Sequence, residues 1–180
     1  MNIPNTLTVL RIICVPVIII LLMQGAFLKA LIVFAISGLT DGLDGFLARV
    51  LNQQTALGAY LDPIADKALI MSCFITLSIK NVIPGWLTVI VISRDCIILL
   101  GILILSLMSV AYEIRPSIVS KITTLFQILT VFFALAARSF PIFTDQGWLL
   151  YVLFTLTAIL TGISGLHYLF RGIRLMNRSI

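Results

Sequence analysis

Apolar runs of about membrane length follow one another along almost the whole chain, separated by short polar turns. A helix that crosses a bilayer needs roughly 20 predominantly apolar residues. Of the 180 residues, 61% are hydrophobic and only 11% are charged, and the mean hydropathy is +1.18. Soluble domains carry about 25% charged residues. We therefore predict one all-α integral membrane domain over residues 1–180, with about six transmembrane helices.

The polar turns predict where each span begins and ends. Tryptophans at the start of two runs favour the membrane interface, where their amphipathic rings are stabilised. A basic tail follows the last run. The predicted parts are an interfacial segment Met1–Thr8, then spans Val9–Met23, Leu28–Val50, Ala56–Ile79, Trp86–Met108, Ser117–Ala137 and Trp148–Phe170.

Basic residues near the ends of the runs are divided unequally between the two sides of the membrane. The formal net charge of +5 is therefore interpreted as an orientation signal and as contact with anionic lipid, not as affinity for nucleic acid. The positive-inside rule predicts that both termini face the cytoplasm. The more basic side carries Arg11, Arg49, Arg115, Arg171, Arg174 and Arg178, and the other side carries Lys29, Lys80 and Arg138.

Four aspartates interrupt this apolar pattern within Asp41–Lys67. By insertion scales, an aspartate at the centre of a membrane helix costs roughly 2.5–3.5 kcal/mol, so four approach about 10–14 kcal/mol. Such a concentration of acids needs a shared counter-charge, and a divalent metal is the best candidate. One pair ends the second predicted span and the other begins the third. Both pairs should therefore lie on the cytoplasmic side.

The spacing of the acids predicts how they meet. Asp41 and Asp44 are three residues apart, and Asp62 and Asp66 are four apart, so each pair shares one face of a helix. Two neighbouring helices with two carboxylates each can hold two divalent ions, which suits in-line phosphoryl substitution. The alternative is a set of intramembrane salt bridges to Arg49, Lys67 and Arg94. With Asp95 counted among the acids, that alternative leaves at least one acid unpaired.

The pattern D-x2-D-G-x2-A-R-x8-G-x3-D-x3-D resembles the signature of the CDP-alcohol phosphatidyltransferase family. Further similarity lies in N-I-P-N-x-L-T-x-x-R at Asn2–Arg11, in I-S-R-D at Ile92–Asp95 and in P-x3-S-K-x2-T at Pro116–Thr124. The resemblance implies a six-helix membrane fold in a homodimer. It also implies an active site open to the cytoplasmic leaflet, here the inner membrane of a bacterium.

The resemblance also implies a role for each residue of the pattern. Asp66 would be the general base that takes a proton from the acceptor hydroxyl of the substrate. Small residues would let the cytidine of CDP-diacylglycerol approach, and Arg49 would hold its diphosphate. The metal ligands for two Mg²⁺ or Mn²⁺ ions would be Asp41, Asp44, Asp62 and Asp66, and the nucleotide-binding residues would be Gly45, Ala48, Arg49 and Gly58.

The sequence leaves two candidates for the acceptor alcohol. Four basic residues suit a phosphorylated acceptor, and glycerol-3-phosphate is the first expectation. Phosphatidylglycerol is the alternative, because two motifs depart from the glycerophosphate-using pattern and resemble the cardiolipin synthases of the family. Arg94 and Asp95 could equally form a mutual structural pair. The candidate acceptor residues are Arg11, Arg94, Arg115 and Lys121.

Two functions of other classes remain as alternatives. A divalent-cation transporter would also place acids in membrane helices, but it would be expected to distribute ionisable residues to both faces and to contain repeated halves. Neither feature is found in the sequence. A scaffolding membrane protein would gain nothing from buried acids.

Overall fold

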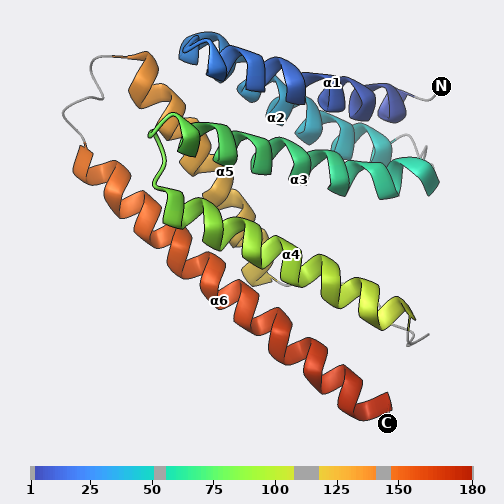
Figure 1. Cartoon of the computed structure of the whole chain (residues 1–180). Helices are drawn as coiled ribbons and strands as arrows, with labels where there is room; N and C mark the ends of the chain where they lie inside the picture. The colour runs from blue at the N-terminus through green and yellow to red at the C-terminus, as the bar shows by residue number, and fades with distance from the viewer. Residues whose placement is uncertain (1–2, 51–55, 108–117, 141–146, 180) are drawn as a thin grey trace. The chain divides into compact units, whose positions relative to one another are not determined.

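The computed structural model contains six helices, and the described residues contain no strand (Figure 1). The structure describes residues 3–50, 56–107, 118–140 and 147–179. It describes side chains only within 10–40, 65–101, 118–140 and 147–170. The helices are α1 (Ile3–Met23), α2 (Phe27–Val50), α3 (Ala56–Ile79), α4 (Gly85–Leu107), α5 (Ile118–Ser139) and α6 (Gly147–Ser179).

The predicted spans agree with four helices to within two residues, and the two terminal helices are longer than predicted. Helix α1 begins at Ile3, so residues 3–8 of the predicted interfacial segment continue into the first span as one helix. Pro4 is compatible with this start because proline is tolerated in the first turn of a helix. Helix α6 runs to Ser179 over 33 residues, so the predicted basic tail is helical. No proline follows Phe170 to stop it.

The helices form two compact units, of which the first comprises Met1–Ile83 and Val131–Gly147. Within it, α1 packs against both α2 and α3. Helices α1 and α3 run in the same direction and α2 runs in the opposite direction (Figure 1). The end of α2 and the start of α3 therefore lie at the same end of this unit as the start of α1. Its buried apolar side chains include Ile18, Leu22, Phe34, Phe74 and Leu77.

The predicted turn between the first two helices is closed by a glycine cap. Gly25 has a φ of 74°, a left-handed conformation that glycine adopts without steric strain. The amide of Ala26 donates to the carbonyl of Leu21 over 2.9 Å, which is the long hydrogen bond of a Schellman motif. Asn81, with a φ of 55°, has the same place after α3. The cap at Gly25 returns the chain sharply, so that α2 can pack against α1.

The second unit comprises Pro84–Thr130 and Trp148–Ile180, and buried polar side chains join its helices. Thr130 and Thr157 share a hydrogen bond of 2.7 Å between their hydroxyl oxygens. The Thr123 hydroxyl donates to the Leu160 carbonyl over 3.2 Å. Small polar side chains let membrane helices approach closely and bond to each other. We call this set the polar seam: Thr123, Gln127 and Thr130 of α5 with Thr157, Thr161 and Ser164 of α6, all buried.

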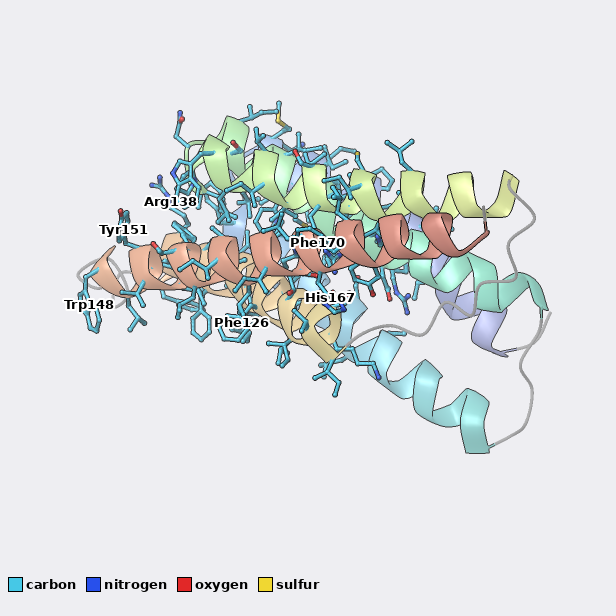
Figure 2. All side chains as sticks on the ribbon, turned by 90° about the horizontal axis from the view of Figure 1, so that it is seen from below. Phe126, Arg138, Trp148, Tyr151, His167 and Phe170 are labelled. Carbon is cyan, nitrogen blue, oxygen red and sulfur yellow. The ribbon has the colours of Figure 1, made fainter. Side chains whose placement is uncertain are left out.

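Two helices are long and apolar enough to cross a membrane, counted over the described residues only. They are α5 and the Gly147–Phe170 part of α6, with mean hydropathies of 1.8 and 2.0. Only 33% and 28% of their apolar windows are buried, whereas the core helix of a soluble protein is mostly buried. Trp148 and Tyr151 are 68% and 67% exposed and project outward near the start of α6 (Figure 2). Aromatic side chains of this kind anchor membrane helices at the interface.

Candidate active site

The acidic residues predicted from the sequence lie on two helices of the first unit. Asp41 and Asp44 are on the C-terminal half of α2, and Asp62 and Asp66 are on the N-terminal half of α3. These two half-helices lie at the same end of the unit (Figure 1). Helical backbone at both positions means that each aspartate pair shares a face of its own helix.

Most of the predicted metal and nucleotide residues lie outside the side chains that the structure describes. The convergence of the four carboxylates therefore stays a prediction that the backbone arrangement permits. Arg115 lies outside the described residues altogether. The predicted residues with helical backbone but no described side chain are Asp41, Asp44, Gly45, Ala48 and Arg49 of α2 and Gly58 and Asp62 of α3.

Asp66, the predicted general base, forms an ion pair with Arg11 of α1. The Nη1 atom of Arg11 lies 2.5 Å from Oδ1 of Asp66. The Arg11 side chain is 3% exposed and the Asp66 side chain is 39% exposed. The guanidinium therefore holds the carboxylate from the buried side, and much of the carboxylate stays accessible. The sequence predicted Arg11 as an acceptor residue, and its described contact is with the candidate base.

The donor chemistry of the acidic residues fits a hard divalent cation. Mg²⁺ prefers oxygen ligands, and carboxylate, carbonyl and water suit Mg²⁺ and Mn²⁺ alike. All four predicted ligands supply carboxylate oxygens. Three of them lie outside the described side chains, so the described ones form no group of three metal-binding residues. The accessible carboxylate of Asp66 is the described member of the predicted site.

A second cluster of charged and polar groups lies inside the second unit, around Arg94 of α4. Arg94 is 4% exposed, and its Nη1 donates to Oδ1 of Asp95 over 2.5 Å. Its Nη2 donates to the hydroxyl of Ser120 over 2.5 Å and to that of Ser164 over 3.1 Å. The guanidinium carbon also lies 5.9 Å from the centre of the Tyr168 ring. We call these five residues the Arg94 cluster.

The Arg94 cluster joins three helices, because Ser120 belongs to α5 and Ser164 to α6. The mutual pair of Arg94 and Asp95, left open by the sequence, is present. Ser120 stands in the P-x3-S-K-x2-T motif, which could have drawn attention to it. Ser164 carried no motif signal. Its only signal is the spacing of small polar residues on the last helix, at Thr157, Thr161 and Ser164.

Lys121 lies beside this cluster, in a hollow on the surface of α5. The hollow has a volume of about 360 Å³ and is lined by Ser120, Lys121, Thr124, Leu125 and Ile128. Lys121 makes no hydrogen bond or ion pair with the described part of the chain. Leu125 and Ile128 are 54% and 38% exposed. The hollow thus combines one lysine with an apolar wall.

Comparison with known proteins agrees with the pattern of the sequence. The sequence model of the CDP-alcohol phosphatidyltransferase family matches residues 1–163. Rat cardiolipin synthase (CMP-forming) is 36% identical over 93% of this chain and 60% of its own length. A probable phosphatidylglycerophosphate synthase of Mycobacterium tuberculosis is 34% identical, with 96% of this chain and 82% of that protein covered.

A third relative is the CDP-diacylglycerol--glycerol-3-phosphate 3-phosphatidyltransferase of Wigglesworthia glossinidia brevipalpis. It is 36% identical, and 94% of each chain is covered. This chain spans 60% of the length of the rat and human cardiolipin synthases and nearly all of the Wigglesworthia protein. The aspartate motif on α2 and α3 and the match over residues 1–163 lead to one conclusion. The chain belongs to the CDP-alcohol phosphatidyltransferase family.

Proposed function

We propose that the chain transfers a phosphatidyl group from CDP-diacylglycerol to the hydroxyl of an alcohol and releases CMP, as a step of membrane phospholipid synthesis. The observation that carries the proposal is the shared end of α2 and α3, where the family's four aspartates lie on helical backbone. Family membership and the names of the three relatives support it. The proposal includes six membrane spans, a homodimer and a cytoplasmic active site in a bacterial inner membrane.

The proposed reaction is an in-line substitution at phosphorus. Asp66 accepts the proton of the acceptor hydroxyl at a carboxylate oxygen. The acceptor oxygen then attacks the phosphorus that carries diacylglycerol, a new phosphate ester bond forms, and the bond to CMP breaks. Arg11 fixes the orientation of Asp66 through its 2.5 Å contact. Arg49 holds the diphosphate of the nucleotide.

The remaining residues of the motif bind the nucleotide and the metal ions. Gly45, Ala48 and Gly58 leave room for the cytidine beside the helix backbones. The aspartates Asp41, Asp44, Asp62 and Asp66 would hold two Mg²⁺ or Mn²⁺ ions. When bound, divalent ions at such a site neutralise charge on the diphosphate and on the departing CMP.

Glycerol-3-phosphate is the first acceptor of the proposal, in line with the name of the Wigglesworthia relative. A specific observation favours phosphatidylglycerol as a second candidate. Two of the four predicted acceptor cations are matched by carboxylates, because Arg11 pairs with Asp66 and Arg94 pairs with Asp95. Lys121 has an exposed apolar wall beside it. Among the predicted acceptor cations that the structure describes, this leaves Lys121, and one cation beside an apolar wall suits a singly charged phosphodiester with acyl chains better than a small phosphomonoester.

The proposed activity is tested by following CMP release from CDP-diacylglycerol with the purified chain. We expect release only when an acceptor alcohol and Mg²⁺ or Mn²⁺ are both present, and we expect chelation of the metal to abolish it. Glycerol-3-phosphate and phosphatidylglycerol are compared side by side at equal concentration. The proposal would be contradicted if metal-dependent CMP release were absent with both acceptors and also with inositol phosphate, serine and choline.

Lys121 should bind the phosphate of the acceptor. We expect Lys121→Met to raise the KM for the acceptor about tenfold, since a hydrogen bond to a charged group contributes roughly 1.5–3 kcal/mol. The KM for CDP-diacylglycerol should stay within about twofold of the original value. Lys29→Met is the matched control, because Lys29 is another exposed lysine, on α2. Equal effects of the two substitutions would contradict the role of Lys121.

A further inference from the structure

We propose that Ser164 is a positioning residue of the acceptor site, acting through Arg94. The inference rests on the proposed function, because it requires that the hollow on α5 receives the acceptor. Ser164 is fully buried, at 0% exposure, so it does not itself touch a ligand in the hollow. Its influence must pass through the guanidinium that it contacts.

The Arg94 guanidinium is contacted from three helices. Asp95 neutralises Arg94, but it is the next residue of the same helix and therefore moves together with Arg94. Ser120 of α5 and Ser164 and Tyr168 of α6 contact the guanidinium from the other two helices. Among the described residues of those helices, the two serine hydroxyls are its hydrogen-bond partners. Ser164 contacts both Nη2, at 3.1 Å, and Nε, at 3.3 Å.

Ser120 links the guanidinium to the hollow. Nη2 of Arg94, which contacts Ser164, also donates to the hydroxyl of Ser120 over 2.5 Å. Ser120 lines the hollow beside Lys121. A continuous path of contacts therefore runs from Ser164 through Arg94 to the wall of the hollow. Loss of the Ser164 hydroxyl should let the guanidinium shift. The position of Ser120 and the positive electrostatic potential beside Lys121 should then change as well.

Ser164 is itself held in place by the packing of α6 against α5. Ser164 is the last residue of the polar seam along α6, and the seam holds α6 against α5 by hydrogen bonds such as Thr130 to Thr157. The helix that presents Ser164 is thus fixed to the helix that bears the hollow. A hydroxyl placed in this way can hold the guanidinium in one position, whereas a water molecule or a mobile side chain could not.

The test measures KM for both substrates in CMP release by Ser164→Ala. We expect the KM for the acceptor to rise about tenfold, equal to about 1.4 kcal/mol, and the KM for CDP-diacylglycerol to stay within about twofold. Glycerol-3-phosphate and phosphatidylglycerol are both used as acceptors. Ser164→Thr retains the hydroxyl and should restore the acceptor KM. A purely structural role of Ser164 would alter both KM values, or neither.

Gly165→Ala provides the matched control at the neighbouring position. A methyl group there would lie 3.5 Å from Cγ of Arg94, an ordinary contact with its aliphatic stem, so the acceptor KM should not change.

If Ser164→Ala does not fold, Ser164→Cys replaces it in the test, because cysteine is similar in size and a weak hydrogen-bond partner. An unchanged acceptor KM in Ser164→Ala, or an acceptor KM that stays raised in Ser164→Thr, would overturn this inference alone. Absence of CMP release by the unmodified chain would overturn the proposed function and this inference with it.

Discussion

Replacement of Asp66 by asparagine should reduce CMP release at least about a thousandfold, a loss within the range for a general base. The amide does not accept a proton at neutral pH, and it is a weaker metal ligand than a carboxylate. The fold should persist, because the Oδ1 atom of asparagine can still accept the hydrogen bond that Arg11 donates over 2.5 Å. Turnover is measured as CMP release, and folding is measured as the thermal unfolding midpoint in detergent.

The control and the metal dependence separate the two roles of Asp66. Ser72→Ala is the control. Ser72 lies further along α3, and its hydroxyl donates to the Leu69 carbonyl of its own helix, so turnover should not change. If a higher Mg²⁺ concentration restored turnover to Asp66→Asn, Asp66 would act as a metal ligand and not as the base. Near-normal turnover at ordinary Mg²⁺ would make both assignments wrong.

The helices were predictable from sequence because long apolar runs and short polar turns are local features. The turn at Gly25, for instance, follows from an apolar run that ends at a glycine. The start of α1 and the end of α6 lie beyond the predicted spans for a physical reason. Hydropathy marks where a chain leaves the apolar layer, but a helix continues until its backbone is capped or broken. Nothing between Phe170 and Ser179 breaks it.

The candidate site was predictable only where its residues form a pattern along the chain. The four aspartates do so, since their spacing follows the helical period. The contact between Arg11 and Asp66 joins residues 55 positions apart, and that between Arg94 and Ser164 joins residues 70 positions apart. No local pattern encodes such contacts, because they depend on how the helices pack. Both arginines were therefore predicted as acceptor residues, but neither contact was predicted, although Asp66 itself was identified as the candidate base.

Replacement of Asp95 by leucine should destabilise the protein by about 3–5 kcal/mol, the usual result of removing one partner from a buried ion pair. Arg94 would keep its contacts with the hydroxyls of Ser120 and Ser164 but would lose the carboxylate that neutralises it. At 4% exposure the guanidinium cannot recover that loss from water. The free energy of unfolding is measured in mixed detergent micelles. Asp95→Asn should have a smaller effect, because its amide oxygen still accepts from Nη1.

The double substitution Arg94→Met with Asp95→Leu should recover most of the lost stability, because apolar side chains of similar size often replace a buried ion pair without penalty. Although its stability recovers, the double variant should have a raised KM for the acceptor, since the path of contacts from Ser164 to the hollow has lost its guanidinium. Stability and acceptor KM would then respond independently to changes in one cluster. If Asp95→Leu alone had the same free energy of unfolding as the original chain, the charge of Arg94 would have to be balanced by other groups. If the double variant kept a normal acceptor KM, the Arg94 cluster would only hold α4, α5 and α6 together.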